Sequence, residues 1–505
     1  MRDTHRYVSL RANIQRAARV FLTAGACLLG AALIAQAPTP RALPPKAPVL
    51  ITGTRVLDVS GGRYLAPASI LIEDGLIKSV TPEPPAALPA GTKRLQAAGS
   101  VLVPGLIDAH AWAAPTADLD ADYFYLMGLA HGVTGYRTLN VRTGWGVAQR
   151  GRALSGATLA PRLWTSGRGI NQGSSPGRWL FDAQDGSAAA EEAAQQVASR
   201  VDWIAGYDAL GADIYKAMVA AVRGSTVRVS GQPGAASMSD LVAAGVSSIE
   251  TLAYPLKPSN GPPDDAWLAA SAKELGTLHT RLLRARVTLV PMMAAARARA
   301  FPDEVPRDPA LALLPESRRA ALTAALAKLP AAEVVKARRA WTSQAAFLTR
   351  FVRAGGRVAA GTGFELRGYP VPGVGLHREL AALVRAGLTP AEALRAATVT
   401  AAELVRTKAG FAGFAPGTEA NCIVVQGDPL KRIEDLGNIT SVVRTGEALD
   451  VKLLLARAKQ ATAPRGLPST ALPSTTLGAG RAGKPPVSMT GRKTPGSISQ
   501  WRPGL

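Results

Sequence analysis

The chain has 505 residues, with a hydrophobic content of 47% and a charged content of 19%. These values are typical of a globular protein with a large core and argue against a disordered or fibrous chain. The formal net charge is +22 at pH 7, but it is unevenly placed, since residues 451–505 carry nine Lys or Arg and no acid.

The first 37 residues are typical of a secretory signal peptide. A basic region with five arginines precedes an uncharged apolar run at residues 20–34, and Ala35-Gln36-Ala37 fits a small-x-small cleavage site. The apolar run is shorter than the roughly 20 residues that a membrane-spanning helix needs. We therefore expect an exported protein, periplasmic or secreted, without a membrane span after cleavage. Lipidation at Cys27 is the alternative.

Two sets of short β-type segments flank a long middle. Residues 38–48 are Pro-rich and indicate a linker, and residues 49–56 and 69–80 are typical of strands. The second segment contains Asp74-Gly75, a pair that favours a tight hairpin turn. Near the other end, residues 420–426 and 439–445 are again β-type. We expect residues 38–103 and 409–455 to pair into one small β-sandwich.

The middle alternates short apolar runs with Ala-rich amphipathic stretches. The expected strands are residues 101–107, 132–139, 161–167, 212–218, 227–230, 247–252, 287–292 and 357–362. Repeated strand–helix units predict a parallel sheet, and this number of units predicts an α/β fold with a TIM-like (β/α)₈ barrel over residues 104–408.

The tail, residues 456–505, is predicted to be disordered and basic. It is rich in Ala, Pro, Ser, Thr and Gly and lacks apolar periodicity. Its charges are spread singly with little aromatic interleaving, which indicates a solvated tail without specific nucleic-acid binding. Binding to anionic surfaces is the alternative.

Three segments carry a resemblance to a known family. The first is residues 101–110, which read VLVPGLIDAH, and the other two are residues 375–405 and 414–430. Together they resemble the amidohydrolase superfamily, in particular its imidazolonepropionase-like and prolidase-like branch. The resemblance implies a divalent metal such as zinc, which activates water for hydrolysis of C–N bonds. It also implies ligands at strand ends: His-x-His after strand 1, Lys or Glu after strand 4, His after strands 5 and 6, and Asp after strand 8.

This chain departs from that ligand pattern at most positions. His110 and Lys216 stand at remnant ligand positions, whereas other residue types occupy the remaining four. These replacements are Trp112, Ser230, Thr251 and Gly363. Without metal ions, Lys216 is expected to be a free ammonium paired with an acid, for which Asp108 and Glu250 are candidates.

Two functional hypotheses follow. In the first, the chain is an exported amidohydrolase-like protein with a largely degenerate metal site and no cofactor, which is catalytically silent or binds a small molecule in the barrel mouth. In the alternative, it is an active hydrolase of C–N bonds of non-peptide or dipeptide type. That enzyme would use His110, Lys216 and the tentative catalytic residues Glu365 and His377, with one divalent metal such as zinc or none. The sequence does not indicate an oligomeric state.

Overall fold

A computed structural model describes residues 46–115, 119–173, 179–257, 262–363, 370–406 and 413–461. The expected signal peptide and most of the tail lie outside these residues. Within them, no helix combines the length and apolar character needed to cross a bilayer.

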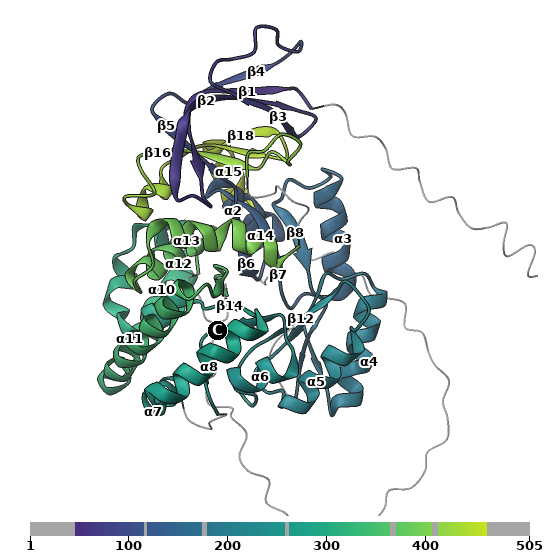
Figure 1. Ribbon diagram of the computed structural model, residues 1–505, viewed down its shortest axis with the longest axis vertical. Helices are drawn as coiled ribbons and strands as arrows, with labels where there is room; N and C mark the ends of the chain where they lie inside the picture. Colours follow the sequence, from purple (N-terminus) through teal and green to yellow (C-terminus); the bar gives the residue numbers. More distant parts are fainter. Residues whose placement is uncertain are drawn as a thin grey trace, which may run out of the picture. The chain divides into compact units, whose positions relative to one another are not determined.

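One mixed sheet joins both flanks of the chain (Figure 1). Its central contact pairs β5 (Ser100–Pro104) antiparallel with β16 (Cys422–Gln426), so that residues more than 300 positions apart lie side by side. The expectation that the two flanks pair is therefore confirmed. The other strands of this sheet are β1 (Val49–Asp58), β2 (Arg63–Glu73), β3 (Leu76–Thr81), β4 (Lys93–Gln96), β17 (Ile439–Arg444) and β18 (Glu447–Asp450).

The predicted Asp74-Gly75 hairpin is also confirmed. Strands β2 and β3 pair antiparallel around it, with Glu73 opposite Leu76. Asp74 and Gly75 both have positive φ, at 50° and 81°. Two such residues match the right-handed twist of the strands that they connect, which is why this pair of residue types favours the turn.

The middle of the chain forms two parallel sheets. The first has the order β6 (Leu106–Ala111), β7 (Val133–Thr138) and β8 (Arg162–Thr165). The second runs β10 (Leu180–Asp182), β9 (Gly169–Asn171), β11 (Trp203–Gly206), β12 (Arg228–Gly231), β13 (Ser248–Glu250), β14 (Thr288–Val290) and β15 (Arg357–Val358). Backbone contacts link the two sheets: Ser166 bridges Trp203 in parallel, and Ala109 N donates to Ala360 O at 2.8 Å.

Helices alternate with these strands, as the sequence predicted. Those of the middle are α2 (Ala121–Ala130), α3 (Thr143–Leu154), α4 (Gly186–Ala198), α5 (Ala212–Ala221), α6 (Met238–Ala244), α7 (Pro263–Ala269), α8 (Ala272–Ala285), α9 (Met293–Ala300), α10 (Glu316–Ala327), α11 (Ala331–Arg353), α12 (Val374–Arg385), α13 (Pro390–Ala397) and α14 (Val399–Leu404). Short 3₁₀ segments lie at Pro302–Arg307, Pro309–Leu313 and Ile433–Gly437.

Two expected strands need correction. Residues 212–218 are not a strand but the start of α5, which buries Ile214, Tyr215 and Met218. Their spacing places them on one helical face. The strand that was expected at residues 212–218 is instead β11, whose four residues are all buried. The expected strand at residues 101–107 covers parts of two strands, since β5 belongs to the flanking sheet and β6 to the central one.

The boundary of the tail also needs correction. Helix α15 (Val451–Gln460) is capped by the Asp450 carboxylate and buries Leu454 and Ala458. The disordered tail expected from residue 456 is therefore wrong for residues 456–460, because their helix packs against the folded part. Residues 462–505 lie outside the described part of the chain.

Candidate functional site

His110 lies near the carboxyl end of β6, as the sequence predicted. Every residue of this strand is buried. The His110 Nδ1–H donates to Glu250 Oε2 at 2.8 Å, and Glu250 is the last residue of β13. His110 is only 6% exposed and Glu250 only 1%. The strand ends therefore bring an imidazole and a carboxylate into direct contact away from solvent.

A third member of this cluster, Arg137, was missed by the sequence reasoning. It lies in β7 and its side chain is 0% exposed. Its Nη2 donates to Glu250 Oε1 at 2.7 Å, and its Nη1 donates to Ser248 Oγ at 3.0 Å. Its Nε donates to the carbonyl of Ala109. An arginine inside a short strand-like segment, VTGYRT, was the available signal, since an arginine that a strand buries requires a partner.

The guanidinium of Arg137 also stacks on an aromatic ring. Its Cζ lies 4.5 Å from the centre of the Trp203 ring, at the start of β11. Cation–π contact of this kind adds to the ion pair with Glu250 and orients the planar guanidinium. Strands β6, β7, β11 and β13 thus all contribute to one buried cluster. We call His110, Arg137 and Glu250 the buried triad.

The charges of the buried triad hold Glu250 ionised. Burial alone would raise the pKa of its carboxyl, but the Arg137 charge and the hydrogen bonds from His110 and Ser248 outweigh that effect. Together they lower the pKa to about 2 from an ordinary 4.5. Glu250 is therefore a carboxylate whose negative charge is neutralised within the protein, because three neighbouring side chains, Arg137, His110 and Ser248, already donate to its oxygens.

Asp108 lies next to the buried triad in β6, and the contacts of its carboxylate differ from those of Glu250. Its carboxylate accepts from the backbone N–H groups of His110 at 3.1 Å and Thr362 at 3.0 Å. It also accepts from Thr362 Oγ1 at 2.7 Å. Burial raises its pKa to about 6, and these hydrogen bonds only partly oppose the rise. Among the described residues, no arginine or lysine pairs with it as Arg137 pairs with Glu250.

Trp112 directly follows β6 and lines a small cavity there. Its indole Nε1 is buried and has no hydrogen-bond partner among the described residues. The indole lines a cavity of about 10 Å³ together with Asp108, Phe124 and Tyr136. A space of that size holds about one water molecule. The cavity therefore has little room for a hydrated cation.

The other three replaced positions do lie at strand ends. Ser230 is in β12, and its Oγ contacts Ile204 O at 3.4 Å. Thr251 directly follows β13 with φ 70°, and Gly363 follows β15 with φ 57°. The Gly363 N–H donates to the carbonyl of His110 at 2.9 Å. The assignment of these positions to strand ends is consistent with the structure, but their side chains offer no imidazole or carboxylate.

The expected role of Lys216 is wrong. Because residues 212–218 are helical, its side chain lies on the surface of α5, where it is 57% exposed and pairs with Asp213 at 2.9 Å. It contacts neither Asp108 nor Glu250, which have the partners described above. The carboxyl end of β11, where the resemblance implies a lysine or glutamate, is Ala205-Gly206.

Of the two tentative catalytic residues, the structure places only His377, which does not join the buried triad. His377 is buried in α12, where its Nε2–H donates to the carbonyl of His131 at 2.8 Å. Burial, followed by the neighbouring His131, lowers the pKa of His377 to about 3. It is therefore a neutral packing residue at physiological pH. Glu365 lies outside the described residues.

The donor set does not fit the metal that the resemblance implies. Over the described ranges, no group of three or more His, Cys, Asp or Glu side chains is placed to hold a metal ion. Protein metal sites of this kind use about three or four such ligands. In the buried triad, Glu250 is bound to Arg137, and a second cation beside a guanidinium would be repelled.

Comparisons with known proteins agree with the fold. No protein-family model matches the chain, and no curated protein matches it. Among solved structures, a candidate prolidase from Bifidobacterium longum is 22% identical, with a TM-score of 0.64 over 82% of this chain and 100% of that one. Bottromycin amidohydrolase is 22% identical, with a TM-score of 0.65 over 82% and 91%. The A. niger ochratoxinase is 19% identical, with a TM-score of 0.60 over 80% and 96%. At these identities, the likeness shows that the chain has the fold of prolidase-like and amidohydrolase proteins.

Proposed function

We propose that this chain is an exported amidohydrolase-superfamily protein whose metal centre has degenerated, and that it is silent in metal-dependent hydrolysis. Its two parallel sheets form one (β/α)₈ barrel, and its flanking sheet is the composite β-sandwich. The Ser166–Trp203 bridge and the Ala109–Ala360 hydrogen bond support closure of the barrel, because they join the two edges of the first parallel sheet to the second. The solved structures of the same fold support the assignment.

The observation that carries this proposal is the buried triad. In an enzyme of this superfamily, the strand ends hold a cation that is bound from solution. Here Arg137 supplies a permanent cation from within the chain, 2.7 Å from Glu250. The guanidinium is completely buried, and each of its three nitrogens donates to a protein acceptor. It therefore stabilises the strand ends without leaving an exchangeable position for water.

Backbone geometry supports the view that ligands were lost from a site of this kind. Thr251 has φ 70°, a conformation that β-branched residues rarely adopt. Histidine and aspartate tolerate this region better, and these are the residues that the resemblance implies at positions 251 and 363. Gly363, with φ 57°, shares the same left-handed backbone. The chain thus keeps the backbone of two ligand positions without their side chains.

Metal content tests the proposal directly. The purified protein is offered zinc or manganese, dialysed and subjected to elemental analysis. We expect less than about 0.1 equivalent per chain, because one imidazole is too few to hold the ion tightly. One or more tightly held equivalents would contradict the proposal. As a positive control, Trp112→His, Ser230→His, Thr251→His and Gly363→Asp are combined with Arg137→Met, and folding is verified by circular dichroism. This variant should gain zinc, whereas the same four substitutions with Arg137 retained should gain less.

A second candidate is an active hydrolase of C–N bonds, and Asp108 is the observation that favours it. This carboxyl lines the small cavity and has a pKa raised to about 6, a value suited to general base catalysis. Dipeptides and N-acyl amino acids are incubated with the wild-type protein and with Asp108→Asn, with and without zinc. Turnover that Asp108→Asn abolishes would establish this candidate and refute the proposal of a silent protein.

We further propose export, with residues 1–37 removed as a signal peptide, residues 38–103 and 409–455 as the halves of the β-sandwich, and residues 104–408 as the barrel. The Ala35-Gln36-Ala37 site supports this division. Amino-terminal sequencing of the protein recovered from the periplasm or medium should begin at Pro38. An intact amino terminus in the cytoplasm would refute export. We also propose that the barrel mouth binds a small molecule.

A further inference from the structure

We propose a second ligand site, distinct from the buried triad: a pocket for a small organic anion with an apolar body, between α3, the end of α4 and the starts of β8, β11 and β12. The cavity there has a volume of about 520 Å³. Volumes of this order accommodate small-molecule ligands. Because these parallel strands begin here, the pocket lies at the end opposite to their carboxyl termini, where Ser230 lies.

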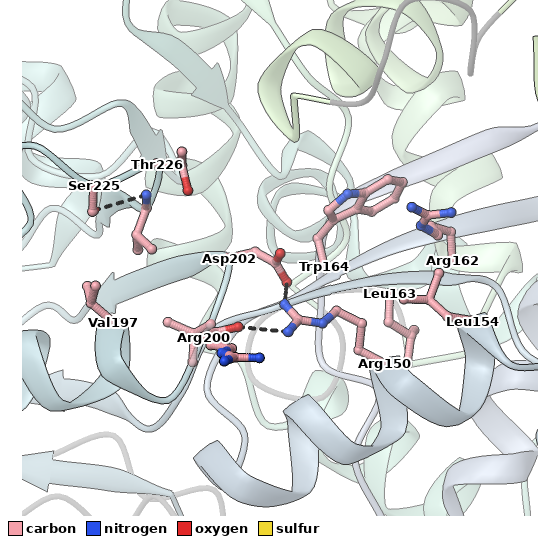
Figure 2. A pocket seen from close by; sticks show the side chains of 12 residues that line it. Arg150, Leu154, Arg162, Leu163, Trp164, Val197, Arg200, Asp202, Ser225 and Thr226 are labelled. Atoms are coloured by element: carbon pink, nitrogen blue, oxygen red, sulfur yellow. Dashed lines mark hydrogen bonds and ion pairs between the residues drawn. The ribbon is translucent and has the colours of Figure 1, made fainter. Parts of the chain in front are cut away.

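The pocket combines an apolar wall with a cluster of cations (Figure 2). Figure 2 shows Trp164, Leu163 and Arg162 on one side and Ser225 and Thr226 on the other. The apolar wall consists of Leu154, Leu163, Trp164, Val197, Val201 and Val227. The charged lining consists of three arginines, Arg150, Arg162 and Arg200, against one acid, Asp202. A positive excess beside apolar surface favours a ligand with an anionic head and an apolar body.

The three arginines are not equivalent. Arg150 is fixed, because its Nη1 pairs with Asp202 at 2.6 Å and its Nη2 donates to the carbonyl of Arg200 at 2.7 Å. Asp202 in turn accepts from the backbone N–H of Thr165 at 2.8 Å. Arg162 pairs at 3.2 Å with Glu419, a residue outside the lining, and its side chain stays 35% exposed. Arg150 is therefore a structural part of the pocket wall, and Asp202 already neutralises its charge.

Arg200 is the cation that the fold leaves for a ligand. Its guanidinium has no ion pair or hydrogen bond within the part of the chain that the structure describes. It directly follows the last turn of α4 with φ 62°, a position where helices usually place glycine. An arginine side chain disfavours this left-handed backbone conformation. The hydrogen bond from Arg150 Nη2 holds the Arg200 carbonyl in place. The planar guanidinium matches a carboxylate with two parallel hydrogen bonds.

The test uses phenylacetate, which presents a carboxylate on an aromatic body, titrated calorimetrically into the full chain. Phenyl phosphate probes whether a phosphate head serves equally, and benzyl alcohol is the neutral control. We expect saturable binding of at least one of the anions, weakened about tenfold by Arg200→Gln, since a charge-assisted hydrogen bond is lost. Binding should also weaken as salt is raised. Arg339→Gln, an exposed arginine of α11 far along the chain, is the matched control and should leave binding unchanged.

Each outcome decides the proposal. The Arg200 side chain is exposed and has no partner among the described residues, so Arg200→Gln should fold, and its melting midpoint verifies this. Absence of binding by both anions, equal binding of benzyl alcohol, or an equal effect of Arg200→Gln and Arg339→Gln would overturn the site. Because the pocket is separate from the buried triad, this result does not depend on the metal content of the protein.

Discussion

Replacing Arg137 by methionine should destabilise the protein far more than an ordinary substitution. Methionine keeps most of the apolar volume of arginine but removes the charge that compensates Glu250. The Glu250 carboxylate, only 2% exposed, would then keep His110 and Ser248 as neighbours but lose its ion-pair partner. Ser248 and the carbonyl of Ala109 would each lose a donor as well.

The size of the effect follows from the burial of the pair. Removing one partner of a buried ion pair typically costs about 3–5 kcal/mol, because an uncompensated charge remains inside the protein. Arg137→Met should therefore lower the apparent free energy of unfolding by about that amount. Adding Glu250→Gln removes the stranded charge and keeps an amide beside His110. The double variant should recover about half of the loss, which gives a coupling between Arg137 and Glu250.

Urea unfolding followed by circular dichroism, on the wild type, both single variants and the double variant, measures this cycle. The pH dependence supplies an internal check. The lowered pKa of Glu250, about 2 against an ordinary 4.5, contributes stability that is present above pH 4.5 and is lost as pH falls towards 2. The gap between wild type and Arg137→Met should narrow over that window. A loss below about 1 kcal/mol, or additive single effects, would refute the reasoning about the buried triad.

Three further predictions concern single residues. Burial raises the pKa of Asp108 to about 6, above an ordinary 3.8, so the free energy of unfolding of the wild type falls as pH rises through this window. Asp108→Asn does not titrate, so its stability relative to the wild type should increase by up to about 3 kcal/mol between pH 4 and 7. Thermal melts across this pH range measure the difference. Thr251→Gly should raise the melting midpoint, since glycine adopts the left-handed φ of 70° without strain and lacks the buried Oγ1, which has no partner among the described residues. The expected increase in the free energy of unfolding is about 1 kcal/mol. A lower midpoint would contradict this. Lys216→Ala should change stability by less than about 0.5 kcal/mol and leave metal content unaltered, because its pair with Asp213 is exposed; a larger change would show that the lysine has a role that the structure does not assign.

Much of the fold could be predicted because its signals are local. The Asp74-Gly75 turn, the β-type flanks and the alternation of apolar runs with Ala-rich stretches each depend on neighbouring residues, and the structure contains the corresponding elements. The segment that ends in His110 was recognisable for the same reason. The failure at residues 212–218 is instructive, because a short apolar segment there fits a strand and a helix face equally well. The correct strand, β11, has only four residues and too little pattern to be identified from sequence alone.

By itself, the sequence determined which residues stand at most of the strand ends: His110, Ser230, Thr251 and Gly363 are fixed by the segments around them. Only the tertiary structure decided what surrounds them. Arg137 reaches Glu250, 113 positions away, because the packing of the two parallel sheets brings β7 of one and β13 of the other within reach of each other's side chains. Lys216 moved to the surface because a helix replaced the expected strand. Pairing between distant residues is set by how strands and helices pack, and a local pattern carries no information about that choice.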